Sequence, residues 1–138
     1  MRVIAKLAGI LHRFRSDKRG VSAVEFALVL PLMVVLLFGI IQFGITFNNY
    51  ISLTDAVRAG ARTATVSRHE EDPVAVTVER VREAATDLNE DDLLIEVESS
   101  WEPGEQVKVA ASYPYSIKVL GVTIKSGRMN SATTERVE

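Results

Sequence analysis

Residues 18–44 read KRGVSAVEFALVLPLMVVLLFGIIQFG and determine the fold of the N-terminal part of the chain. No charged residue occurs from Phe26 to Thr54, and the densest apolar part, residues 26–47, is about 22 residues long. At 1.5 Å per residue this length is enough to cross the roughly 30 Å of hydrocarbon in a bilayer. The stretch therefore predicts a membrane span, which begins directly after a carboxylate, Glu25.

Charge is distributed unevenly about this span. Residues 1–20 carry six basic groups and one acidic group, about +5, whereas the remainder carries about −7, and the whole chain has a net charge of −2. The Lys/Arg excess before the span predicts a cytoplasmic N-terminus and an extracytoplasmic C-terminal body. The basic residues precede a membrane segment and do not form a folded basic face, so no nucleic-acid partner is expected.

Two further features bound the class of protein. The sequence has no cysteine, which excludes disulfides, thiolate metal ligands and a cysteine nucleophile. The apolar region is too long for a cleaved secretory signal and does not end in a small-x-small cleavage site, so a retained span is the favoured interpretation.

The helix is expected to continue beyond the membrane. Residues 45–68 contain no proline, and one long helix is predicted from about residue 22 to about residue 67. Apolar residues that can share one side of its outer half are Ile51, Ala56, Val57, Gly60, Ala64 and Val66. Ala59, Gly60, Ala61 and Ala64 make this half slim, which would permit close helix packing. Alternatively, the alanines serve only as good helix formers.

Pro31 lies inside the predicted span. Proline removes one backbone hydrogen bond and opposes the carbonyl of the residue four positions earlier, here Ala27. A kink or local melting of the helix is therefore expected near Pro31.

Two interpretations of Glu25 remain open. It could be an interfacial acid that reaches water at little cost. If the chain is instead cut between Gly20 and Val21, Glu25 becomes the fifth residue of the mature protein and the Val21 amine a cation at the same depth. A carboxylate in a membrane is tolerated when it is paired, and the Val21 amine of a neighbouring subunit is a suitable partner.

The basic run Lys18-Arg19-Gly20 followed by VSAVEFALVLPLM resembles a type IV prepilin leader and its junction. The longer pattern resembles the TadE-like family of minor pilins, or pseudopilins, of Tad (Flp) pilus systems. Residues 23–31 match that family's AVEFALVLP core, residues 42–44 its span end, and residues 56–62 its AAREGAR-like segment, with Ala59 in place of the usual Glu. The match is dense over residues 18–64.

This resemblance implies a role in pilus assembly and no enzymatic activity. The expected partners are a prepilin peptidase that cuts after Gly20, other pilins or pseudopilins, and the Tad inner-membrane platform proteins. Gly20 would be the recognition residue, Val21 the new terminus, which could be methylated, and Glu25 the intersubunit carboxylate that sets register. The expected location is the bacterial inner membrane, single-pass. Three questions stay open: whether the protein enters the filament or stays at the platform, whether its role is that of TadE or of TadF, and what the pilus binds.

The body after residue 68 is predicted to be a small α+β unit. Asp72 and Pro73 indicate an N-cap and first position of a helix. Its amphipathic stripe, recurring at helical spacing, is Val74, Val78, Val81, Ala85 and Leu88. Residues 93–99 and 107–115 alternate as strands around a turn at Pro103-Gly104. A further strand, which Gly127 interrupts, is expected after residue 120.

The predicted fold class is therefore α+β: a long N-terminal transmembrane helix, a short helix and an antiparallel sheet of three or four strands. The predicted domains are a leader (1–20), the long helix (21–68) and an extracytoplasmic domain (69–138). Residues Tyr113-Pro114-Tyr115 resemble the family's strand end, and residues 132–138 its usual tail.

Candidate ligand-binding residues have simpler explanations. His69 lies among acids in a loop, residues 89–92 lack the spacing of a calcium loop, and His12 lies in the leader. Trp101 is expected to cap the hairpin's own core. No nucleophile motif or phosphate loop occurs, so no catalytic residue, cofactor or metal is predicted. The alternative function is an uncleaved single-pass protein whose outer domain binds a partner.

Overall fold

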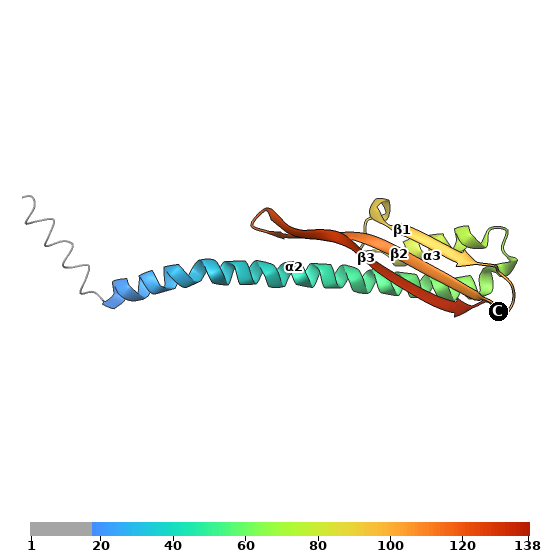
Figure 1. Cartoon of the computed structure of the whole chain (residues 1–138), viewed down its shortest axis with the longest axis horizontal. Coiled ribbons are helices and arrows are strands. Elements are labelled where there is room, and N and C mark those ends of the chain that lie inside the picture. Colours follow the sequence, from blue (N-terminus) through green and yellow to red (C-terminus); the bar gives the residue numbers. More distant parts are fainter. Residues whose placement is uncertain (1–17) are drawn as a thin grey trace, which may run out of the picture. The chain divides into compact units, whose positions relative to one another are not determined.

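The structure is a computed structural model that describes residues 18–138 (Figure 1). The leader residues 1–17, with His12, lie outside the described part. The elements are α2 (Lys18–Val66), η1 (Ser67–His69), α3 (Pro73–Ala84), η2 (Glu90–Asp92), β1 (Leu94–Ser99), β2 (Gln106–Val119) and β3 (Val122–Arg136). This order confirms the predicted α+β class. The chain divides into two compact units, Met1–Ile40 and Ile41–Glu138, with the boundary inside α2.

The part of α2 in the first unit is an exposed apolar helix. It continues through Pro31 without interruption, so the helix is not melted there, and the kink stays a prediction. Large apolar side chains from Val21 to Phe38 are exposed, and none of the most apolar 18-residue window is buried. By length and composition, this is one helix that could cross a membrane.

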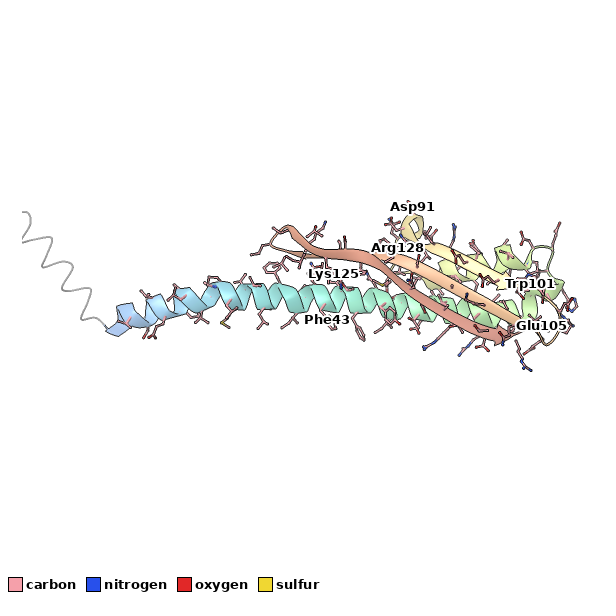
Figure 2. All side chains as sticks on the ribbon, viewed as in Figure 1. Phe43, Asp91, Trp101, Glu105, Lys125 and Arg128 are labelled. Carbon is pink, nitrogen blue, oxygen red and sulfur yellow. The ribbon has the colours of Figure 1, made fainter. Side chains whose placement is uncertain are left out.

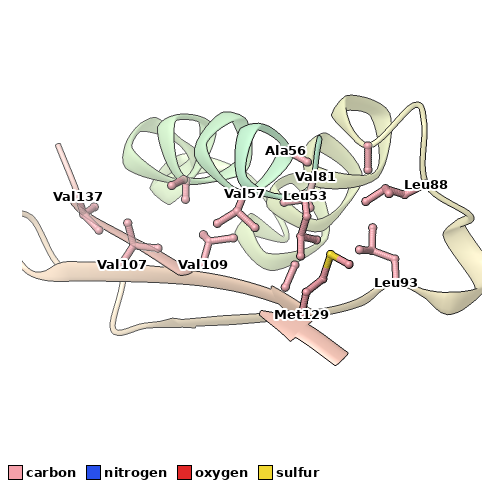
Figure 3. Close-up of a cluster of buried hydrophobic side chains, with 14 residues drawn as sticks. Leu53, Ala56, Val57, Val81, Leu88, Leu93, Val107, Val109, Met129 and Val137 are labelled. Carbon is pink, nitrogen blue, oxygen red and sulfur yellow. The ribbon is translucent and has the colours of Figure 1, made fainter. Parts of the chain in front are cut away.

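In the second unit, α2 and α3 lie on one face of the sheet and enclose the core (Figure 3). The fully buried large side chains include Leu53 and Val57 from α2, Val81 from α3, and Val107 and Val109 from β2. On the predicted outer stripe of α2, Ala56, Val57, Gly60 and Ala64 are buried. The prediction was wrong for Ile51 and Val66, which are exposed, because Leu53 takes the inward position near one end and η1 begins at the other.

The small residues of α2 provide a close helix contact within the chain. A Cβ placed on Gly60 would overlap the Cγ2 atom of Val81 on α3, and it would lie 3.5 Å from the carbonyl oxygen of Thr77. Ala56, Ala61 and Ala64 are also buried. The slim face of α2 is thus buried in the core and, at Gly60, packs closely against α3, in addition to any effect of alanine on helix formation.

The start of α3 follows the predicted cap. The Asp72 carboxylate accepts a hydrogen bond from the Ala75 backbone N–H at 2.9 Å, and Pro73 occupies the first helical position. The helix ends at Ala84, four residues before the predicted end, because Thr86, Asp87 and Asn89 have low helix propensity. Of the predicted stripe, Val81, Ala85 and Leu88 are buried, whereas Val74 is exposed and Thr77 takes an inward position.

The sheet has three antiparallel strands in the order β1-β2-β3. The predicted alternation of β1 is confirmed, since Leu93 is buried just before the strand and Ile95 and Val97 pack against the core. The end of the sheet is fixed to α2, because the Glu138 N–H donates to the Thr65 carbonyl at 2.8 Å.

Strand β2 is longer than predicted and does not end at Tyr113-Pro114-Tyr115. It runs to Val119, and Leu120 and Gly121, with φ of 50° and 84°, form the two-residue turn to β3. Pro114 fits because β1 pairs with β2 only as far as Ser112, so beyond that point one side of β2 is a free edge that needs no N–H donor.

Strand β3 is also continuous, and the expected interruption at Gly127 was wrong. Gly127 pairs directly with Tyr115 across the two strands. A Cβ on Gly127 would lie 3.1 Å from the Tyr115 ring, so the tyrosine covers the glycine. The ring supplies the packing that the glycine lacks, as in aromatic rescue of strand glycines.

Candidate processing and assembly site

The residues predicted to act in processing and assembly lie in the first turns of α2. Gly20, Val21 and Glu25 are exposed and, with Val24, line one shallow surface hollow. Val21 and Glu25 are four residues apart, which places them on the same side of the helix. The structure therefore brings the proposed new terminus and the carboxylate to one face.

Packing among residues 18–138 does not explain the glycine at position 20. Within this part of the chain, nothing lies within 4 Å of the position that a Gly20 Cβ would take. This contrasts with Gly60 and Gly127, where a Cβ would meet Val81 or Tyr115. Gly39 and Gly44 are as open as Gly20, so an open setting is shared by the glycines of the apolar helix.

Glu25 makes no hydrogen bond or ion pair with another residue in the range 18–138. Its side chain is exposed and free to meet a group from outside the chain. The neighbouring helix surface is apolar, including Val24, Phe26 and Val29. A carboxylate in this setting is favourable where water or a cation reaches it.

Pro31 lies six residues after Glu25 on the same exposed helix, and it does not line the surface hollow that contains Glu25. Proline has no polar side-chain group and no backbone N–H. The role expected of Pro31 is therefore in the shape of the helix.

The polar residues weighed as metal ligands have local roles. His69 accepts a hydrogen bond at Nε2 from the Arg68 Nε–H at 2.9 Å. Asn89 caps η2, since its side-chain oxygen accepts from the Asp91 N–H at 3.3 Å and its amide donates to Asp92 at 3.1 Å. Within residues 18–138, no group of three or more His, Cys, Asp or Glu side chains could hold a metal ion.

Trp101 lies beside the core, as expected from its place next to the turn. Its side chain is half-buried against the core residues, and its backbone N–H donates to Ser99 Oγ at 3.0 Å. Its φ of 59° is unusual for a non-glycine residue. The Ser99 bond and the core contact hold this conformation.

The outer part of the β2–β3 hairpin is a surface that was not predicted from the sequence. The sequence does contain a signal for this hairpin. Val119 and Val122 are apolar residues that end and begin two strand-like runs, and Leu120-Gly121 between them forms a two-residue turn. It was obscured because leucine is rare at a position with positive φ. The residues of this segment form an exposed tip outside the core.

An exposed apolar helix followed by a small α+β unit defines a helix-anchored class of protein. The family model described as TadE-like protein matches residues 20–62, which begin at Gly20 and end within α2, before α3 and the sheet. This confirms the resemblance predicted from the sequence: over these residues the chain is similar to the TadE-like family. No curated protein and no solved structure matches the chain.

Proposed function

We propose that this protein is a minor pilin or pseudopilin that takes part in assembling a Tad (Flp) pilus. The observation that carries the proposal is the TadE-like match, which starts at Gly20 and contains Glu25. The exposed apolar surface of α2 supports it, because such a surface needs a bilayer or neighbouring apolar helices around it. The function is packing and assembly, without turnover of a substrate.

In this proposal a prepilin peptidase of the inner membrane cuts between Gly20 and Val21. The basic leader stays on the cytoplasmic side until the cut, and the α+β domain, residues 69–138, lies on the extracytoplasmic side. The absence of a side chain at Gly20 lets the protease approach the backbone closely. Because the fold of residues 18–138 does not need a glycine there, recognition by the peptidase is a sufficient reason for it.

After the cut, Val21 carries a free amine at the N-terminus of α2. Glu25 then pairs with the Val21 amine of a neighbouring subunit and fixes the axial register of the two helices. The pair suits a low-dielectric setting, since each charge is costly there without the other. The partners are other pilins or pseudopilins and the inner-membrane platform proteins of the Tad system.

A second function is favoured by one feature of the structure. The Gly20–Val21 bond lies inside α2, whose first residue is Lys18, and a protease needs an accessible, extended backbone. An uncleaved chain would be a single-pass anchored protein whose outer unit binds a partner, with Glu25 an interfacial acid. Helix ends fray, however, and Gly20 lies within the first turn, where opening the helix costs little.

The mass of the protein from native membranes separates the two functions. We expect intact-mass measurement or terminal sequencing to give a chain that starts at Val21, with or without a methyl group on its amine. An intact Met1 in a host with an active prepilin peptidase would contradict processing and leave the anchored protein as the function.

A further inference from the structure

The outer part of the β2–β3 hairpin, residues 113–128, differs in charge from the rest of the second unit. We call this segment the distal hairpin. It contains Lys118, Lys125 and Arg128 and no acidic residue, whereas residues 69–112 contain thirteen acidic residues and three basic ones. Figure 2 shows Lys125 and Arg128 on this segment. The distal hairpin is therefore net positive, whereas the rest of the body after residue 68 is net negative.

The end of the distal hairpin is apolar and uncovered. Leu120, Val122 and Ile124 are 62%, 63% and 66% exposed. With the half-buried Ile117 and Val119, they form what we call the apolar tip. A register shift at Ile117/Lys118 inserts one extra residue into β3, which re-aims the side chains of the tip.

Most of the charge on the distal hairpin is free to meet a ligand. The Arg128 guanidinium is used internally, donating to the carbonyl oxygens of Ser112 at 2.9 Å and Asp92 at 3.0 Å. Lys118 and Lys125 make no ion pair within residues 18–138. Two unpaired lysines thus flank an apolar tip.

The distal hairpin points toward the end of the second unit where Ile41 and the exposed apolar residues of α2 lie. The Glu138–Thr65 hydrogen bond places the start of β2 beside the last turn of α2, and Met129 lies further along the core near Leu53 (Figure 3). From Gln106 to Val119 the strand spans about 43 Å. From Thr65 back to Ile41 the helix spans about 36 Å. The apolar tip therefore comes level with the start of the unit.

At that level α2 exposes side chains typical of a lipid-facing helix. Ile41, Phe43, Ile45 and Phe47 are exposed, and Phe43 and Phe47 stack at 6.0 Å. Figure 2 shows Phe43 projecting outward from α2. Because the apolar tip lies level with the stretch Ile41–Phe47, it is exposed to the same medium, lipid or water, as that stretch.

We propose that the distal hairpin is a second membrane contact, in which the apolar tip enters the outer face of the bilayer that holds α2. Lys118 and Lys125 then meet anionic lipid headgroups, as basic residues near a membrane surface do. Two contacts would fix the tilt and rotation of the C-terminal unit over the bilayer, which a single helix leaves free. This inference rests on the membrane anchoring in the proposed function.

Lipid-attached quenchers can test the contact, because the chain lacks cysteine and accepts single labels. Three single-cysteine variants of the full chain, Leu120→Cys, Glu102→Cys and Leu36→Cys, carry an environment-sensitive fluorophore in vesicles of phosphatidylcholine and phosphatidylglycerol. We expect nitroxides on headgroups and shallow acyl positions to quench the label at position 120, and deep nitroxides to quench position 36. Position 102, at the opposite end of the sheet, should respond only to iodide in water.

Each other outcome overturns the inference in a distinguishable way. If position 36 is quenched by lipid but position 120 responds only to iodide, the hairpin stays in water and anchoring stands. Protection of position 120 from both quenchers would mean that a protein, such as a second copy, covers the tip. If position 36 is not quenched by lipid, the anchoring fails, and the proposed function fails with the hairpin contact.

Charge reversal tests the lysines separately from the apolar tip. In Lys118→Glu/Lys125→Glu, we expect lipid quenching at position 120 in anionic vesicles to fall to or below the level seen in vesicles of phosphatidylcholine alone. The matched control, Arg82→Glu/Arg136→Glu, changes the net charge equally outside the distal hairpin and should leave this quenching unchanged. An equal loss in both variants would contradict a specific role of Lys118 and Lys125.

Discussion

Gly60 and Val81 meet where α2 crosses α3, and the contact leaves no room for a side chain on residue 60. A Cβ there would overlap Val81 Cγ2 and touch the Thr77 carbonyl, so the Val81 side chain or one of the two helices would have to shift. This contact joins α2 to α3 within the second unit. It makes the outer half of α2 part of the core of that unit as well as a continuation of the exposed apolar helix.

Gly60→Ala should therefore destabilise the C-terminal unit. Overpacking costs about 1–3 kcal/mol, and the overlap with Val81 places this variant in the upper part of that range. Alanine returns up to about 1 kcal/mol through its helix propensity, so a net loss of about 1–2 kcal/mol is expected. Trp101, the chain's only tryptophan, lies beside the core and reports unfolding of the full chain in detergent micelles by its fluorescence.

Two variants serve as controls for the Gly60 contact. Gly44→Ala meets nothing within 4 Å and should not lower the free energy of unfolding. In a Val81→Ala background the overlap is gone, so adding Gly60→Ala should be neutral or stabilising. An equal loss in both backgrounds would mean that Val81 is not what excludes a side chain at residue 60.

The two tyrosines of Tyr113-Pro114-Tyr115 hold the hairpin by different means. Tyr113 Oη accepts a hydrogen bond from the Asn89 N–H at 3.2 Å, whereas the Tyr115 ring covers Gly127. We expect Tyr113→Phe to lower the free energy of unfolding by about 0.5–1.5 kcal/mol, because it leaves the Asn89 N–H without that acceptor. Tyr115→Phe keeps the ring over Gly127 and should have little effect.

Tyr115→Ala completes this comparison. Removing the ring uncovers Gly127 and should speed amide hydrogen exchange in residues 113–128 more than elsewhere in β2. If Tyr113→Phe and Tyr115→Phe have the same effect on unfolding, the assignment of the hydrogen bond to Tyr113 is wrong.

The parts of the fold that were predicted have strong local signals. The apolar run with no charge from Phe26 to Thr54 predicts α2, and Asp72 with Pro73 predicts the start of α3. The alternation in residues 93–99 and 107–111 predicts the inward faces of β1 and β2. These elements were predicted because the order of residues along the chain alone determines them: the uncharged apolar run, the capping pair and the alternation of apolar residues.

The parts that were not predicted depend on tertiary context. Pro114 indicates a strand end, but it is accommodated because β1 stops at Ser112. Gly127 indicates a break, but Tyr115 covers it from the neighbouring strand. The inward position of Thr77 follows from its hydroxyl donating to the Pro73 carbonyl at 2.8 Å, which satisfies the buried group. The local sequence does not contain these partners.

The proposed processing site rests on the spacing of Gly20 and Glu25 in the sequence, and the structure places both residues on the exposed surface of α2. Gly20→Val tests its proposed role. A bulky side chain next to the cut should block the peptidase, so the leader stays attached and the intact mass includes residues 1–20. Gly20→Ala is expected to be tolerated. The matched control, Gly44→Val, adds the same side chain at an equally open glycine and should be cut normally.

Glu25→Ala separates processing from assembly. The cut should still occur after Gly20, because the carboxylate lies five residues beyond it, but the mature protein should fail to copurify with the other pilins. Asp55→Ala removes an acid elsewhere on α2, one that pairs with Arg58 at 3.5 Å on the surface, and should assemble normally. Normal assembly of Glu25→Ala would remove the proposed intersubunit role.

A shifted carboxylate distinguishes that role from a simple effect on the helix end. An acid in the first turns of the mature helix also favours the positive end of the helix dipole, and Glu25 is close to the Val21 amine of its own chain. The double variant Val24→Glu/Glu25→Ala keeps an acid near this end but turns it about 100° around the helix axis. We expect it to fail in copurification as Glu25→Ala does, because the register contact requires one face. Restored copurification would mean that charge at the helix end is sufficient.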